Sequence, residues 1–254
     1  MNTAASPRWL VGGAPRPGAP TVYCFAHGGG SATEYLRWAR DLPDADLRAV
    51  QLPGRGSRFV EPGFGSLDAL VAAFLAEVPL SGTPYVFFGH SLGALIAYEI
   101  TRALRAAGRP LPARLIVSGY PAPHRRHPRV SDPLHGLADD ELIERVASIH
   151  GGIPREVLDS AELRALVVGP LRDDYRVLET YSWRPQEPLA VPLTVLGGRD
   201  DTITFGELDA WREHTTMDVT VRQFPGGHFY LRDQPAPVLK VISEALEGVG
   251  QPDN

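Results

Sequence analysis

The sequence of 254 residues contains one cysteine, Cys24, one lysine, Lys240, and no run of 18 apolar residues. A single cysteine cannot form an internal disulfide, and nothing indicates an oxidising compartment. Because Cys24 lies in an apolar run, we expect a buried and unreactive thiol. The lack of a long apolar run excludes a membrane-spanning helix. The first residues also lack the hydrophobic stretch of a secretion signal, so we expect a cytoplasmic protein.

Positive charge is also scarce. The 25 basic and 30 acidic residues give a formal charge of -5, which offers no case for nucleic-acid binding. His124, His127 and His135 do not have the spacing of metal ligands, so we expect no metal site. The length fits one large α/β domain, or a domain with an inserted cap. Nothing indicates an oligomer, and a monomer is the default expectation.

The chain is organised around the stretch from Tyr85 to Thr101, where an apolar run breaks at Gly-His-Ser-Leu-Gly and restarts with helical spacing. This pattern predicts a strand, a sharp turn and a helix. Gly-x-Ser-x-Gly alone is a weak signal, but in this context it predicts a nucleophile elbow that exposes the hydroxyl of Ser91. Leu92 then opens the helix, and its N–H is free to face an oxyanion.

Strands and helices alternate on both sides of this turn. Residues 1–20 are predicted to be mostly irregular. We expect strands at 21–26, 47–52, 114–119, 191–196 and 219–224, and helices at 67–78, 207–214 and 237–247. The alternation predicts an α/β fold with a mostly parallel central sheet flanked by helices.

The alternation stops over residues 124–188, where the sequence shows only helical patterns, at 139–149, 155–168 and 171–181. We interpret this segment as a helical lid inserted between core segments 1–123 and 189–254. Gly169-Pro170 is expected to separate two of its helices. The segment opens with a basic cluster formed by Arg125, Arg126 and Arg129.

A serine hydrolase of this type needs an acid and then a histidine after the serine, each on a loop that follows a strand. His228 lies in such a glycine-rich loop, whereas His214 is expected to be a surface residue at a helix end. Asp200 and Asp201 compete for the role of the acid, and we favour Asp200. In this scheme His228 removes the proton of Ser91, and the carboxylate orients the imidazole.

The second oxyanion donor is expected from His27-Gly-Gly-Gly30, where a strand delivers a glycine cluster to a helix start. Gly28 is the leading candidate for this donor, and Gly29 is the alternative. Arg55 and Arg58 follow the next strand. We expect both to be solvated loop residues.

Six motifs together resemble the type II thioesterases of polyketide and nonribosomal peptide assembly lines, and the resemblance runs from about Thr21 to Ala245. The motifs are Phe25-Ala-His-Gly-Gly-Gly-Ser31, Leu52-Pro-Gly-Arg-Gly56, Phe88-Gly-His-Ser-Leu-Gly-Ala-Leu95, Val117-Ser-Gly-Tyr-Pro-Ala-Pro123, Leu196-Gly-Gly-Arg-Asp-Asp201 with Trp211, and Gly226-Gly-His-Phe-Tyr230. The resemblance implies an α/β-hydrolase fold with a helical lid. It also implies editing hydrolysis of acyl groups from the phosphopantetheine arm of acyl or peptidyl carrier proteins, with no cofactor of the enzyme's own.

The sequence departs from this family at Ala26, Gly28 and Leu92, where the family usually has Pro, Ala and Met. Leu92 is therefore expected to alter the acyl pocket. Because carrier proteins are typically acidic, the lid arginines are expected to help dock them. The alternatives are an esterase acting on free small substrates, acyl transfer to an acceptor other than water, and a non-catalytic relative that binds a ligand under the lid.

Overall fold

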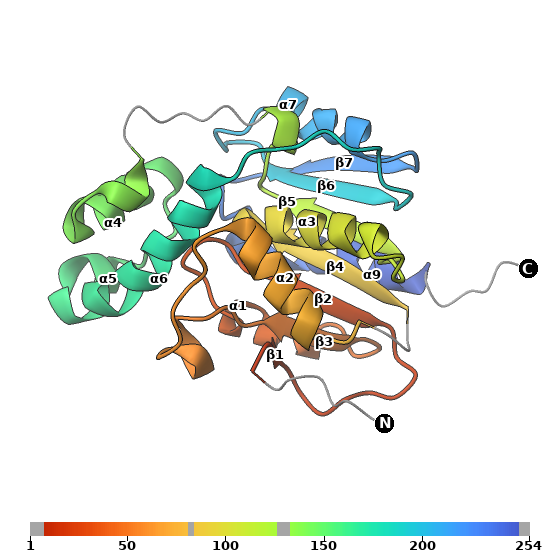
Figure 1. The fold of residues 1–254 in the computed structure, drawn as a ribbon, viewed down its shortest axis with the longest axis horizontal. Coiled ribbons are helices and arrows are strands. Elements are labelled where there is room, and N and C mark those ends of the chain that lie inside the picture. The colour runs from red at the N-terminus through yellow and green to blue at the C-terminus, as the bar shows by residue number, and fades with distance from the viewer. Residues whose placement is uncertain (1–7, 81–83, 126–132, 249–254) are drawn as a thin grey trace, which may run out of the picture.

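The computed structural model describes residues 8–80, 84–125 and 133–248. A seven-stranded sheet forms its centre, with the strand order β1-β3-β2-β4-β5-β6-β7. Strand β1 pairs with β3 in antiparallel fashion, and every other neighbouring pair is parallel. The predicted class, a mostly parallel sheet flanked by helices, is confirmed (Figure 1). The strands are β1 (Leu10–Val11), β2 (Thr21–Phe25), β3 (Asp46–Val50), β4 (Tyr85–His90), β5 (Arg114–Ser118), β6 (Leu193–Gly198) and β7 (Val219–Phe224).

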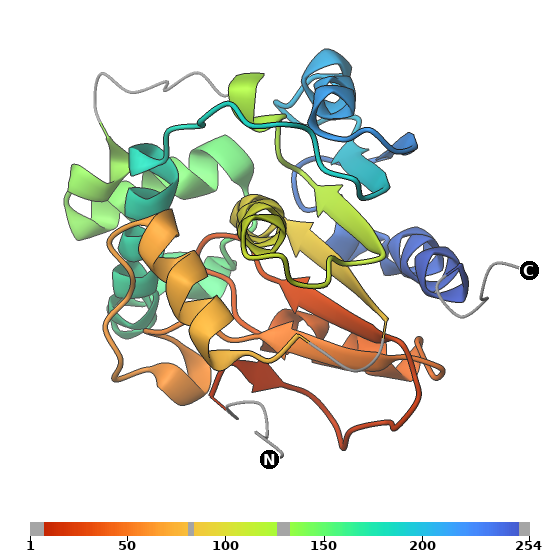
Figure 2. The same cartoon turned by 45° about the vertical axis from the view of Figure 1, so that its right-hand side comes forward.

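Helices cover both faces of this sheet (Figure 2). One face packs against α2 and α3, and the other packs against α1 and α9. Side chains alternate between the two cores along each central strand, so Phe87 joins the first core while Val86 and Phe88 join the second. The helices are α1 (Thr33–Leu36), α2 (Leu67–Glu77), α3 (Leu92–Ala106), α4 (Asp139–His150), α5 (Arg155–Asp159), α6 (Ala161–Thr180), α7 (Phe205–Asp209), α8 (Tyr230–Asp233) and α9 (Pro235–Glu247).

Most predicted strands are confirmed to within two residues at each end, and two differences bear on the fold and the site. Strand β1 lies within residues 1–20, which were expected to be mostly irregular; it has only two residues, too few for a period-two pattern to be recognised. Strand β6 continues to Gly198 instead of ending at residue 196. Its two terminal glycines stay in the ladder with β7, where Gly198 pairs with Phe224. Glycines resemble a turn in sequence, so the loop begins later than expected.

Helices α4, α5 and α6 fall within residues 124–188 and form a third hydrophobic cluster of their own. They lie together beyond one end of the sheet (Figure 1). The prediction of a helix break at Gly169-Pro170 is wrong, because α6 runs through it for 20 residues. Proline removes one helical hydrogen bond, to the carbonyl of Leu166, and this residue is half exposed. None of the described helices is both long and apolar enough to cross a membrane.

Cys24 is fully buried in the second core, as predicted. Burial raises the pKa of its thiol well above the usual value. The thiol therefore stays protonated at neutral pH, which agrees with an inert structural role.

We predict opposite effects for two glycine-to-alanine substitutions. A Cβ at Gly93 would lie 2.1 Å from the carbonyl oxygen of Phe25, whereas a Cβ at Gly206, an exposed residue of α7, would meet nothing within 4 Å. Gly93→Ala should lower the free energy of unfolding by about 3 kcal/mol or more. Gly206→Ala should raise it by about 0.5 to 1 kcal/mol. Chemical denaturation measures both, and a Gly93→Ala protein as stable as the native one would contradict the packing described.

Candidate active site

The predicted elbow is present between β4 and α3. Ser91 has φ 54° and ψ -119°, and it is the only non-glycine residue in the described part of the chain with a positive φ. The turn is possible because its flanking residues lack side chains: a Cβ at Gly89 would lie 2.2 Å from the Gly93 carbonyl oxygen. The Ser91 N–H donates to the carbonyl of Ser118 on β5, at 2.8 Å. The hydroxyl is thus presented at the carboxyl end of the sheet, on a strained backbone.

His228 lies in the loop after β7 and contacts a carboxylate from the loop after β6. Its Nδ1 is 2.8 Å from Oδ2 of Asp201, and the two side chains are 5% and 2% exposed. A Cβ at Gly198 would lie 2.2 Å from the Gly227 carbonyl oxygen, so the two loops pack backbone to backbone. This close packing brings the acid and the histidine together.

The prediction that Asp200 is the acid is wrong, because Asp201 contacts His228. The exposed Asp200 accepts a hydrogen bond from the N–H of Gly226 at 3.2 Å. The reason is the extension of β6: the Asp200 N–H still bonds to the Gly226 carbonyl, at 3.0 Å, and so continues the ladder with β7. Because β6 runs two residues further than expected, the turn after it holds Arg199 and Asp200, and Asp201, which follows this turn, faces the histidine.

Two opposing effects act on the Asp201 carboxyl. Its partial burial would raise the pKa, but the hydrogen bond and charge of His228 and the N–H groups of Thr202 and Ile203 hold the pKa below its usual value. The carboxylate is therefore ionised at neutral pH. An ionised acceptor at Nδ1 favours the tautomer that leaves Nε2 unprotonated and able to accept a proton.

Ser91 and His228 line the same cavity, which has a volume of about 420 Å³. No hydrogen bond joins the Ser91 hydroxyl to His228 within the described residues, and such contacts are often longer before substrate binds. The cavity has a core side and a lid side. The lid side includes Arg145, Val146, Ile149 and His150 from α4 and Tyr175, Leu178 and Glu179 from α6.

The glycine turn after β2 borders this cavity through Gly28. Neither the Gly28 N–H nor the Leu92 N–H makes a backbone hydrogen bond among the residues described. The N–H of Gly29, in contrast, donates to Oδ2 of Asp174 at 2.7 Å. The Gly29 N–H therefore already has an acceptor, and the Gly28 N–H remains the candidate for the second oxyanion donor. The Leu92 side chain is fully buried in the first core and does not line the cavity, which contradicts the expected effect on the acyl pocket.

Besides His228, three histidines are buried in the described part of the chain: His27, His90 and His214. Burial, together with the charges of Arg232, His228 and Arg55, lowers the pKa of His27 to about 3. Burial, followed by the charges of His228 and His27, also lowers the pKa of His90 well below its usual value. Nδ1 of His90 contacts the Ser118 hydroxyl at 2.9 Å. These two imidazoles are neutral at pH 7.

The third, His214, is 4% exposed, so the expectation of a surface histidine is wrong. Its Nδ1 lies 2.7 Å from the hydroxyl of Tyr98, and its Nε2 lies 2.7 Å from Nδ1 of His124. Burial, followed by the charge of His124, lowers its pKa to about 4. The 3-10 helix Ala210–His214 ends against the core, and this buries a residue that a helix-end position alone would leave exposed.

Sequence reasoning missed several residues that line the cavity, among them His150 and Arg145. His150, at the end of α4, packs against His228 with ring centroids 4.7 Å apart and ring planes tilted by 36°. Arg145, on the same helix, is exposed and lines the cavity. Both lie on the lid, where no local motif marks a residue as functional.

The expectation of solvated arginines at positions 55 and 58 is also wrong. Arg55 and Arg58 are 7% and 3% exposed. Arg58 pairs with Glu61 at 2.7 Å and stacks over Trp9, and Arg55 pairs with Asp174 on α6. Loop arginines are usually exposed, and only the position of α6 explains the burial of Arg55.

Only part of the predicted basic cluster can be placed. Arg125 lines the cavity, is about half exposed, and lies 3.4 Å from Glu213. Arg126 and Arg129 lie outside the described residues. His127 also lies outside the described residues. Within the parts described, no group of three His, Cys, Asp or Glu residues could hold a metal ion.

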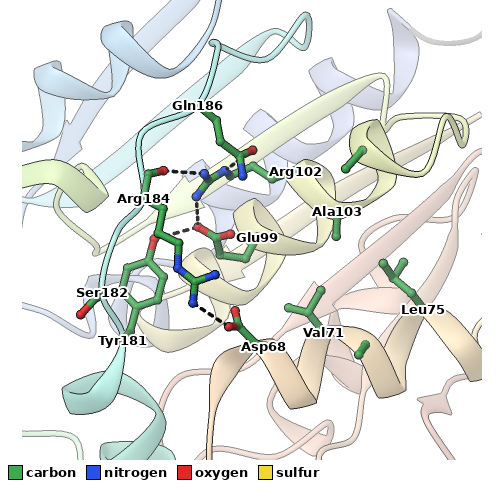
Figure 3. A pocket seen from close by; sticks show the side chains of 12 residues that line it. Asp68, Val71, Leu75, Glu99, Arg102, Ala103, Tyr181, Ser182, Arg184 and Gln186 are labelled. Carbon is green, nitrogen blue, oxygen red and sulfur yellow. Dashed lines mark hydrogen bonds and ion pairs between the residues drawn. The ribbon is translucent and has the colours of Figure 1, made fainter.

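A second cavity of about 290 Å³ lies between α2, α3 and the segment after α6 (Figure 3). Its charged side chains are paired with one another. Glu99 accepts hydrogen bonds from Arg102 and Tyr181 at 2.6 and 2.7 Å, and Arg184 pairs with Asp68 at 2.9 Å. None of the predicted catalytic residues lines it, so we place the active site in the larger cavity.

Comparisons with known proteins agree on one family. The family model described as "Thioesterase domain" matches residues 20–246. The gramicidin S biosynthesis protein GrsT of Aneurinibacillus migulanus is 33% identical, over 91% of this chain and 90% of its own. The thioesterase PikA5 of Streptomyces venezuelae is 36% identical, over 94% and 85%. The solved structure of the type II thioesterase BorB from the borrelidin biosynthetic cluster is 37% identical, with a TM-score of 0.84, over 96% of this chain and 100% of that one.

We predict that the buried histidines make stability depend on pH. The pKa values of His27 and His90 are lower in the folded than in the unfolded chain, where histidine titrates near 6.5. Below that pH the unfolded chain binds more protons, so the free energy of unfolding falls as pH falls. Each of these two histidines should contribute a slope of about 0.7 kcal/mol per pH unit at pH 6.5, which rises towards about 1.4 kcal/mol per pH unit near pH 5.

Urea denaturation at several pH values between 7 and 5 measures this slope. His90→Asn can keep the contact with Ser118 and should make the average slope over this range shallower by about 1 kcal/mol per pH unit. A flat native profile over this range, or an unchanged slope in the variant, would contradict the assignment.

Proposed function

This chain belongs to the thioesterase family, and we propose that it is an editing enzyme that hydrolyses acyl thioesters on the phosphopantetheine arm of carrier proteins. The carriers would be the acyl or peptidyl carrier domains of a polyketide or nonribosomal peptide synthase. The observation that carries the proposal is the pairing of His228 with Asp201 in the cavity that Ser91 lines. The chain is similar to type II thioesterases over nearly its whole length.

The proposed chemistry has two steps. In the first, the Ser91 hydroxyl attacks the thioester carbonyl while Nε2 of His228 takes its proton, and Asp201 stabilises the imidazolium. The tetrahedral intermediate collapses, the C–S bond breaks, and His228 returns the proton to the leaving thiolate. In the second, His228 removes a proton from water, which attacks the acyl-serine ester. His228 then returns the proton to the Ser91 oxygen as the ester C–O bond breaks, and the carboxylic acid is released.

Two backbone N–H groups are proposed to stabilise the oxyanion, those of Gly28 and Leu92. Leu92 directly follows Ser91, and Gly28 borders the cavity that Ser91 lines. Loss of one such donor costs about 3 kcal/mol of transition-state stabilisation. Because these groups belong to the backbone, the departures of this sequence at Gly28 and Leu92 leave the donors in place.

The proposal extends to how the carrier docks. Arg125 and Arg145 both line the cavity and are exposed. Exposed positive charge at this position suits a carrier of opposite charge, since the chain's net charge of -5 would otherwise repel it.

The first test compares hydrolysis of an acylated carrier protein, an acyl-CoA and a simple ester by the native protein and by Ser91→Ala. Native protein should release the acyl group from the carrier, and the variant should lose about three orders of magnitude or more. An untouched carrier together with Ser91-dependent ester cleavage would move the function to a general esterase. No release from any substrate would favour the non-catalytic alternative.

A second prediction separates the two neighbouring aspartates. Asp201→Asn should lower kcat by about four orders of magnitude, because it favours the wrong tautomer of His228. Asp200→Asn is the matched control and should lower kcat by less than about fivefold, since its carboxylate contacts only a backbone N–H. Steady-state kinetics with a small acyl thioester measures both, and a larger loss in the control would contradict the assignment of Asp201.

A third prediction concerns docking. Arg125→Glu should raise KM for an acylated carrier by about fivefold or more, while KM for a small acyl thioester should stay within about twofold. The charge-matched control is Arg40→Glu, at an exposed arginine that does not line the cavity. Equal effects of Arg125→Glu on both substrates would refute a docking role for Arg125, and so would equal effects of Arg125→Glu and Arg40→Glu. Adding Arg126→Glu and Arg129→Glu tests the whole predicted cluster.

A further inference from the structure

A buried ion pair links lid helix α6 to the loops of the core. Asp174 on α6 contacts Arg55, which follows β3, through two parallel hydrogen bonds: Nη1 to Oδ2 at 2.6 Å and Nη2 to Oδ1 at 2.7 Å. The two side chains are 7% and 6% exposed. Such a two-pronged contact fixes both distance and orientation.

The same carboxylate holds the glycine turn that follows β2. Oδ2 of Asp174 also accepts the N–H of Gly29 at 2.7 Å. Nη1 of Arg55 donates to the Gly30 carbonyl at 3.0 Å as well. The ion pair thus contacts the turn twice, once through each partner.

The turn has little rigidity of its own. The Gly30 N–H donates to the His27 carbonyl at 2.9 Å, and Gly29 has a φ of 77°, which is the geometry of a type II turn. Its two central residues are both glycines, which can adopt many other backbone conformations. Interactions from outside must therefore fix its shape, and α6 lies against it: a Cβ at Gly29 would lie 2.9 Å from Leu171 Cδ1.

Burying two charges costs free energy, because both groups lose their hydration. A buried ion pair often adds no stability relative to apolar residues of similar size, so its presence points to a need for defined geometry. The peptide unit that the pair fixes is the one directly after the Gly28 N–H, the proposed oxyanion donor.

We infer that Arg55 and Asp174 are positioning residues that hold the Gly28 N–H in the oxyanion hole, so that lid helix α6 takes part in catalysis through this turn. The inference rests on the proposed serine mechanism. Neither side chain lines the catalytic cavity, and both act through the backbone of the turn. Their loss should weaken stabilisation of the transition state while substrate binding is preserved.

The test uses Asp174→Asn and a matched control on the same helix system. Asp139→Asn breaks the ion pair between Asp139 on α4 and Arg172 on α6, also 2.6 Å long, which does not contact the turn. Enzyme concentration is set by titrating Ser91 with a fluorophosphonate, so that misfolded protein is not counted. The readouts are kcat and KM for a small acyl thioester, and Ki for a trifluoromethyl ketone, whose adduct with serine places an oxyanion in the hole.

Asp174→Asn should lower kcat by about tenfold to a hundredfold and raise Ki by a similar factor, with KM within about twofold. The control should change all three by less than about twofold. If the ion pair has only a structural role, Asp174→Asn should lower the melting temperature, while kcat and Ki per titrated serine should equal those of the control. This result would overturn the inference. So would a rise in KM alone. Failure of the native protein to cleave any thioester would instead refute the proposed function.

A second variant covers the case in which Asp174→Asn does not fold, since it leaves the Arg55 charge buried without its partner. The double variant Arg55→Met with Asp174→Leu removes both charges, fills the space with apolar atoms, and still leaves the Gly29 N–H without its acceptor. The same loss in kcat and rise in Ki are expected for it. Native values of both in this double variant would also overturn the inference.

Discussion

The arrangement of the site depends on close contact between glycine backbones at the elbow. Gly89 and Gly93 leave no room for a side chain, so the start of α3 lies directly on the ends of β4 and β2. This contact forces Ser91 into a positive φ and brings it beside the turn after β2. One steric constraint therefore determines the positions of the serine and of the proposed oxyanion donors, and the polar contacts refine these positions.

Each further loop is fastened by a different interaction. The acid and histidine loops are joined through the backbone approach of Gly198 to Gly227, and Asp201 then fixes the imidazole. The glycine turn is held by charges from outside it, Arg55 and Asp174. The core thus supplies the nucleophile, the base and the acid, while the lid supplies one wall of the cavity and the restraint on the turn.

The sequence was sufficient to predict the fold class and the placement of Ser91 on an elbow, because glycine spacing and apolar periodicity are local signals. It failed between Asp200 and Asp201, since two glycines hid the last residues of β6 and the register decides which carboxylate faces inward. It also failed at Arg55, whose burial comes from a helix about 120 residues further along the chain. Contacts of this range leave no periodic trace in either segment.

The central claim is that Ser91 is acylated during turnover, with His228 and Asp201 as its base and acid. The most direct measurement is mass spectrometry of native protein mixed with an acylated carrier and quenched within one turnover. The account predicts the acyl mass on the peptide that contains Ser91, with a free phosphopantetheine thiol on the carrier. Loss of the acyl group from the carrier with no such adduct, and at an unchanged rate in Ser91→Ala, would contradict it.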